Sequence, residues 1–134
     1  MLPDFFVIGA QKAGSTFLMQ CLEEHPQIFM PPAEVSFFED SRYAPDEFDW
    51  FQRHFDRARE GQVVGVKRPN LLGHPECPER LRKHMPRLKL MVILRHPVER
   101  AVSGYFHYAR SGFIPIVPLE VGMRRLLDGD YDHL

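Results

Sequence analysis

The feature that most constrains the fold is an apolar run that stops abruptly at a glycine. Phe5–Ile8 is continuously apolar, which is typical of a strand buried on both faces of a parallel sheet. Gly9–Gly14 breaks the pattern, and from Ser15 the apolar residues recur at helical spacing until Pro26 ends the helix near His25. The chain therefore begins with a strand, a glycine loop and a helix.

The helix is amphipathic, and we predict that its apolar side faces the core. That side carries Phe17, Leu18, Cys21 and Leu22. The only other cysteine is Cys77, and the two lie in no metal-binding spacing. We expect neither a disulfide framework nor a structural zinc site, and we predict that both thiols are buried.

Strands and helices alternate along the rest of the chain, which predicts an α/β fold with a parallel sheet flanked by helices. Three aromatic residues at helical spacing, Phe48, Phe51 and Phe55, are expected in the core. Without a linker, repeat or low-complexity tract, we predict a single domain over residues 1–134. The further elements expected are strands at 62–66 and 88–94, and helices at 46–55, 78–84, 97–110 and 119–127.

Charge and hydropathy exclude several kinds of partner. The chain has 134 residues, with 17 basic against 18 acidic side chains and a net charge of −1. We therefore expect no nucleic-acid partner and no anionic membrane surface, and a bound anion must be held by a local site. No apolar run approaches the roughly 20 residues of a membrane span. With no signal peptide and Met1 close to the first strand, we expect a cytoplasmic protein without a membrane anchor.

The loop from Gly9 to Thr16 has the composition of a phosphate-binding turn. Backbone N–H groups in such a loop and at the following helix N-terminus bind anions. The loop fits the pattern GxxxxGK[ST] in both glycines and Thr16, but Ser15 replaces the lysine, which stands instead at Lys12. No apolar run ending in Asp supplies a magnesium carboxylate, so we predict a phosphate-ester site without a metal. The alternative is a glycine-rich turn with no ligand.

A second candidate site follows the strand at 88–94. Arg95 is expected at the carboxyl end of a central strand, where open α/β sheets bind ligands. Its guanidinium could hold a phosphate bidentately, and Ser103 on the next helix could add a hydroxyl. The alternative is that Arg95 pairs with Glu99 and binds no ligand; the residues alone favour neither interpretation.

Four motifs, in this order along the chain, resemble the sulfotransferase family. They are GAQKAGST, EVSFF, GVKRP and ILRHPVERAVSGY, and the similarity runs from Asp4 to about Leu127. The nearest branch is that of the heparan sulfate N- and 3-O-sulfotransferases and their bacterial relatives. The resemblance implies a P-loop NTPase-like sheet and 3′-phosphoadenosine 5′-phosphosulfate as donor.

The resemblance also implies roles for individual residues. It assigns Glu34 as general base and Lys67 to substrate binding and transfer, whereas the residues alone allow a solvated glutamate and a surface lysine. Lys12 would contact the leaving phosphate, and Arg95 with Ser103 would hold the 3′-phosphate. The implied donor-binding residues are Gln11, Lys12, Ala13, Gly14, Ser15, Thr16, Phe17, Arg95 and Ser103, and the implied catalytic residues are Glu34, Lys12 and Lys67.

The chain departs from the family pattern in three respects. Ala13 stands where the branch often has glycine, a mild change if the residue need not adopt positive φ. Arg68 replaces a common threonine, which affects the geometry around Lys67. Family domains are considerably longer, so we expect an incomplete domain with an open sheet edge and a tendency to self-associate.

We therefore predict a sulfotransferase that transfers a sulfuryl group to a hydroxyl or amine of a small-molecule or glycan acceptor. Two alternatives remain open. One is a small-molecule kinase or other nucleotide phosphotransferase of P-loop architecture. The other is a truncated nucleotide-binding fragment without activity.

Overall fold

The computed structural model describes residues 1–129, and the predicted single domain extends beyond them to Leu134. The chain divides into two compact units, the first ending at Leu94 and the second beginning at Arg95. The single domain stays a prediction.

The predicted parallel sheet forms the centre of the first unit, with four strands in place of the three expected from the sequence. Its strands are β1 (Phe5–Gly9), β2 (Ile28–Phe29), β3 (Val63–Lys67) and β4 (Lys89–Val92), in the order β2-β3-β1-β4. Strand β1 pairs in parallel with β3 on one side and β4 on the other. The sequence analysis missed β2, because two residues are too few to show a periodic pattern.

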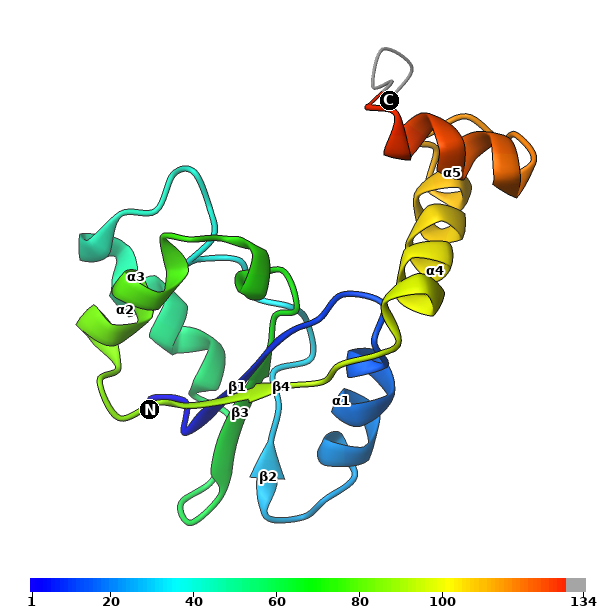
Figure 1. Cartoon of the computed structure of the whole chain (residues 1–134). Coiled ribbons are helices and arrows are strands. Elements are labelled where there is room, and N and C mark those ends of the chain that lie inside the picture. Colours follow the sequence, from blue (N-terminus) through cyan, green and yellow to red (C-terminus); the bar gives the residue numbers. More distant parts are fainter. Residues whose placement is uncertain (130–134) are drawn as a thin grey trace. The chain divides into compact units, whose positions relative to one another are not determined.

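Helices cover both faces of this sheet (Figure 1). Helix α1 (Ser15–Glu23) packs on one face, while α2 (Phe48–Gln52) and α3 (Cys77–His84) pack on the other. The helix expected at 46–55 is divided into α2 and two flanking 3₁₀ turns, Pro45–Glu47 and Arg53–Phe55. The parallel sheet therefore has the covered faces that such sheets require.

The side chains of β1 alternate between two cores of unequal size. Phe6 enters the larger core, where Phe51 and Phe55 are fully buried as predicted. The smaller core contains Phe5, Val7 and Met30. The larger core consists of Phe6, Val35, Phe37, Phe38, Phe51, Phe55, Val64, Val66, Leu71, Cys77, Leu81 and Met85.

Two predictions about buried residues were wrong, and both concern α1. Phe17 is 72% exposed and Cys21 is exposed, whereas Cys77 is buried as expected. Leu18, Met19 and Leu22 contact the smaller core instead. That core has only three buried residues and offers too little apolar surface for the whole stripe of the helix.

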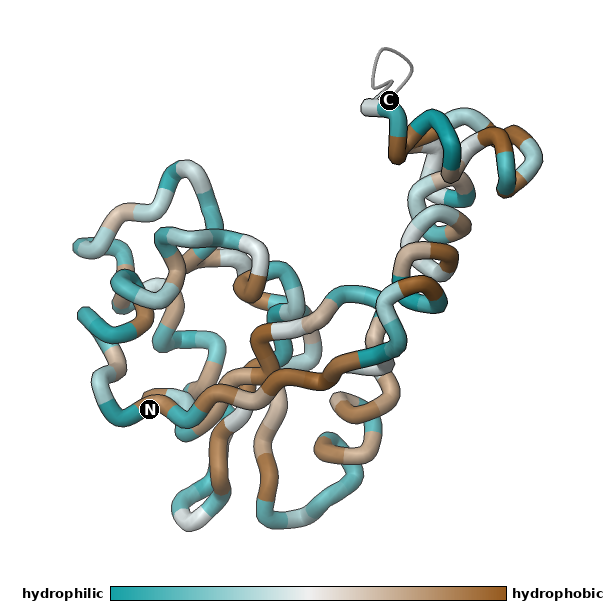
Figure 2. The backbone as a smooth tube through the Cα atoms, viewed as in Figure 1, coloured by the Kyte–Doolittle hydropathy of each residue, from teal (hydrophilic) through white to brown (hydrophobic). Residues whose placement is uncertain are grey.

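Strand β4 lies at an edge of the sheet and leaves apolar side chains uncovered. Leu90, Met91 and Val92 are 51%, 36% and 44% exposed, although they belong to the most apolar strand of the sequence. Figure 2 shows the hydrophobic character of this segment. No strand pairs with the outer side of β4 among residues 1–129, so the predicted open edge is present.

The second unit is a pair of helices with the predicted bounds, α4 (Pro97–Arg110) and α5 (Leu119–Leu127). Tyr105 is buried between them and donates a hydrogen bond of 2.9 Å from its hydroxyl to the carbonyl of Val117. A side chain at Gly122 would overlap the ring of Tyr105, so glycine allows α5 to approach α4 closely.

Candidate functional site

The loop between β1 and α1 is anchored to the carboxyl ends of two strands. The N–H of Ala10 donates to the carbonyl of Ile93 at 2.8 Å, and the N–H of Ile93 donates to the carbonyl of Gly9 at 2.8 Å. The loop therefore lies at the edge where parallel sheets bind ligands, as the sequence predicts.

Two residues give the loop its curvature. Gly14, which caps α1, has φ 101°, and Lys12 has φ 62°, a left-handed conformation that is uncommon for a residue with a side chain. Ala13 does not adopt positive φ, so alanine at this position imposes no backbone strain. The mild departure from the family's glycine is thus compatible with the loop.

The beginning of α1 has the properties of an anion-binding helix terminus. Gly14 provides no side chain to cap the first turn, and Ser15 is buried immediately after it. The N–H groups of a first turn carry partial positive charge and bind anions. Phe17 points its ring away from the core, since it is largely exposed.

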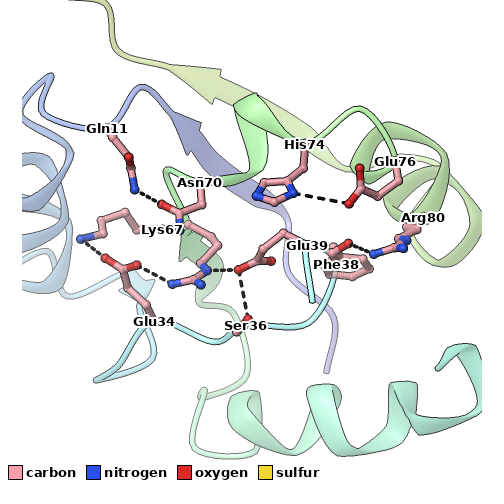
Figure 3. A network of polar contacts seen from close by, with 11 residues as sticks. Gln11, Glu34, Ser36, Phe38, Glu39, Lys67, Asn70, His74, Glu76 and Arg80 are labelled. Carbon is pink, nitrogen blue, oxygen red and sulfur yellow. Dashed lines mark hydrogen bonds and ion pairs between the residues drawn. The ribbon is translucent and has the colours of Figure 1, made fainter. Parts of the chain in front are cut away.

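Gln11 is held by a residue that the sequence analysis did not select. Its side-chain amide donates to Oδ1 of Asn70 (Figure 3). Asn70 lies three residues beyond the end of β3. Its position just after a strand is the sequence signal that could have identified it as a site residue.

Lys67 connects the loop with the predicted base. Its Nζ lies 2.5 Å from Oε1 of Glu34 and 3.3 Å from Oγ1 of Thr16. The lysine side chain is only 6% exposed, so the alternative of a surface lysine is wrong, and Glu34 is not a free solvated carboxylate. A buried ammonium requires an anionic partner, and Glu34 supplies it.

The other oxygen of the same carboxylate is bound by Arg68. The Nη1 atom of Arg68 donates to Oε2 of Glu34 at 2.9 Å, and its Nε donates to Oε1 of Glu39. Burial lowers the pKa of the Arg68 guanidinium, but the hydrogen bonds and charges of Glu39 and Glu34 outweigh burial and raise it above its ordinary value. Arg68 is therefore a permanent cation at this site.

Arg95 and Ser103 belong to the second unit, Ser103 on α4 and Arg95 just before it. Nε of Arg95 lies 3.2 Å from Oε2 of Glu99, so the ion pair considered as an alternative is formed. Both side chains of that pair are substantially exposed, and an exposed pair of this kind is weak. The role of Arg95 and Ser103 toward a 3′-phosphate stays a prediction.

Metal-binding groups of side chains and membrane-spanning helices are both absent from residues 1–129. Within residues 1–129, no three His, Cys, Asp or Glu side chains are grouped closely enough to hold a metal ion. In the same range, no helix has the length and apolar character needed to cross a bilayer.

Comparison with known proteins finds a match to the sulfotransferase family over residues 3–76. A solved sulfotransferase from Alicyclobacillus acidocaldarius has a similar structure, with a TM-score of 0.81 and 27% identity; the match covers 99% of this chain and 60% of that one. The comparison thus matches the fold inferred from the sequence.

Curated relatives are longer than this chain. The membrane-associated sulfotransferase kil1 of Dictyostelium discoideum is 33% identical over 98% of this chain and 28% of its own length. Heparan sulfate glucosamine 3-O-sulfotransferase 5 of Mus musculus is 30% identical over 78% of this chain and 30% of its own length. The chain therefore spans less than a third of the length of these relatives.

Proposed function

Because this chain belongs to the sulfotransferase family, we propose that it takes part in sulfuryl transfer from 3′-phosphoadenosine 5′-phosphosulfate to a hydroxyl or amine of a carbohydrate-like acceptor. The observation that carries the proposal is the position of Lys67, whose ammonium contacts both the loop at Thr16 and the carboxylate of Glu34. An anion-binding loop and a base must lie close together in a transferase, and Lys67 links them.

The loop supplies the donor site in this proposal. The first-turn N–H groups of α1 and the ammonium of Lys12 provide fixed positive charge that binds the anionic phosphosulfate of the donor. When the sulfur–oxygen bond to the 5′-phosphate breaks, the electron pair stays on the phosphate oxygen, and Lys12 stabilises the charge that develops there. The nucleotide product is adenosine 3′,5′-bisphosphate.

Glu34 supplies the base. As the acceptor oxygen or nitrogen bonds to sulfur, its proton passes to the Glu34 carboxylate. Both oxygens of that carboxylate are engaged by cations, so Lys67 must move toward the donor to free Oε1 for the acceptor proton. The carbohydrate acceptor is proposed from the printed names of the relatives that act on heparan sulfate glucosamine.

A single-turnover assay tests the proposal. Protein in excess over sulfur-labelled donor is mixed with a panel of glycans and small alcohols, once with EDTA and once with Mg²⁺. We expect a small amount of labelled acceptor, equal in both conditions, because this loop has no lysine at the position used in metal-assisted ATP hydrolysis. Phosphate transfer from ATP that requires Mg²⁺ would instead support the kinase interpretation.

We further propose a cytoplasmic location and a small-molecule or glycan acceptor as partner, with possible self-association and without nucleic acid or membrane. The near-zero net charge supports the absence of nucleic-acid and anionic-membrane partners, since it provides no general attraction to polyanions. Cell fractionation tests the location, and recovery in the membrane fraction would contradict it.

A further inference from the structure

Arg68, the residue at which this chain departs from the family's threonine, lies between two carboxylates. Its backbone N–H donates to the carbonyl of Val7 at 2.9 Å, which fixes the residue beside the end of β1. Its guanidinium bonds Glu39 and Glu34 at once. We propose that Arg68 is a positioning residue that holds the Glu34 carboxylate where it receives the acceptor proton, an inference that rests on the proposed function.

Glu39 is the group that fixes the guanidinium. Its side chain is 6% exposed, and its Oε1 accepts hydrogen bonds from Arg68 and, at 3.1 Å, from the hydroxyl of Ser36. Its Oε2 is buried and has no hydrogen-bond partner among residues 1–129. A carboxylate so poorly solvated requires a cation, and Arg68 is the one that contacts it. Movement of Arg68 toward solvent would leave this charge without compensation.

The two cations on Glu34 differ in what they can do. Lys67 carries a compact charge on a flexible chain and already contacts Thr16 of the loop, so it can turn toward a bound donor. Arg68 has a planar fork that bonds two carboxylates simultaneously. When Lys67 leaves Oε1, Arg68 therefore keeps Oε2 in place. A threonine, with one short hydroxyl, could not bridge Glu34 and Glu39.

Side-chain mobility tests this inference without any need for turnover. Glutamate-labelled protein is studied by ¹³C relaxation, with the Glu34 signal assigned by Glu34→Gln. We expect a rigid Glu34 side chain in the parent, a mobile one in Arg68→Gln and an intermediate one in Arg68→Lys, because an ammonium bonds one carboxylate at a time. The matched control is Arg42→Gln, which removes the same charge from an exposed arginine paired with Asp40.

Kinetics provides the second measurement. Arg68→Gln should slow single-turnover transfer roughly 10- to 100-fold, the scale of a misplaced catalytic group, while the Kd for adenosine 3′,5′-bisphosphate stays unchanged. Arg68→Lys should recover part of the rate. If an Arg68 variant weakened nucleotide binding as much as it slowed transfer, Arg68 would be a donor-binding residue. That result would overturn the inference.

The two measurements separate the inference from the function on which it rests. If the parent neither binds the nucleotide nor transfers sulfate, the proposed function fails, while Glu34 mobility still decides whether Arg68 holds that side chain. Equal rigidity of Glu34 in the parent and both Arg68 variants overturns the positioning role. If Arg68→Gln does not fold by circular dichroism, Arg68→Lys, which keeps the charge beside Glu39, carries both measurements.

Discussion

The ammonium of Lys67 lies 2.5 Å from a carboxylate oxygen of Glu34, and the lysine is buried while the glutamate is one-third exposed. The buried ammonium can release the carboxylate only when another anion compensates its charge. In the proposed mechanism, a sulfate bound at the loop would take over the ammonium of Lys67 and free Glu34 to act as the base.

Glu34→Gln should retain donor binding and lower the rate of transfer by about 10²- to 10⁴-fold, the usual contribution of a general base. The amide keeps the shape of the side chain but cannot take the proton. Single-turnover transfer and nucleotide titration measure the two effects. Glu24→Gln, at an exposed position just after α1, is the control. Transfer at the parental rate in Glu34→Gln would mean that the base lies elsewhere.

Lys12→Ala should weaken donor binding and slow transfer together, because its charge meets the phosphate before and during bond cleavage. Lys12 has φ 62°, a conformation that glycine adopts without strain. Lys12→Gly therefore removes the charge while suiting the backbone. Equal losses in both variants assign the effect to the charge; recovery in the glycine variant would assign it to loop geometry.

Adenosine 3′,5′-bisphosphate should bind more tightly than ADP or ATP, since Arg95 and Ser103 are predicted to hold a 3′-phosphate. Arg95→Ala should remove most of that preference, about 1.5–3 kcal/mol for a charge-assisted contact. Isothermal titration of the three nucleotides measures it, with Arg100→Ala on α4, the helix that follows Arg95, as control. Equal affinities of the parent for all three nucleotides would show that Arg95 holds no 3′-phosphate and forms only its ion pair with Glu99.

The two cysteines should differ sharply in reactivity. Burial, followed by the charges of Glu39 and Glu76, raises the pKa of the Cys77 thiol to about 11. At pH 8 roughly one thousandth of such a thiol is ionised, and the thiolate is the reactive form. A disulfide reagent should therefore modify exposed Cys21 rapidly and Cys77 only in denaturant or as the pH approaches its pKa. Cys21→Ser checks the assignment, and rapid labelling of that variant at pH 8 would contradict the burial of Cys77.

The open edge at β4 should make the chain self-associate, and we expect weak donor binding and little turnover from this chain alone. Leu90 is 51% exposed on an edge strand with unpaired backbone groups, which is a template for pairing with another chain. Leu90→Lys should lower the apparent mass measured by light scattering. Val98→Lys, at a 63% exposed apolar residue on a helix, is the matched control. A monomeric parent would show that the edge does not drive association.

Local patterns in the sequence predict much of this fold. The change from a continuous apolar run to helical spacing locates β1 and α1, and Pro97 marks the start of α4 because its fixed φ suits a first helical turn. Those signals depend on neighbouring residues only. Which side chains of α1 are buried depends on the apolar surface that the sheet provides. Helical periodicity alone therefore assigned Phe17 and Cys21 to the core, although both are exposed.

The candidate site likewise combines features that local sequence patterns predict with features that depend on tertiary contacts. The loop residues and Lys67 are recognisable from short motifs, but the network behind Glu34 is not. Arg68 and Glu39 are 29 residues apart, and a charged residue after a pair of phenylalanines is normally solvated. The substitution at Arg68 was visible in the sequence, whereas its buried partner became visible only with the tertiary contacts.

The paired hydrogen bonds between Gly9, Ala10 and Ile93 have a consequence for biosynthesis. The loop residues leave the ribosome more than eighty residues before their anchor at Ile93, and β1 lies between strands that both follow it in the chain. Pairing over such sequence separations is slow, because a long stretch of chain must be ordered first. The nascent loop therefore lacks its final support until β4 has been added, and we expect the proposed donor site to form only then.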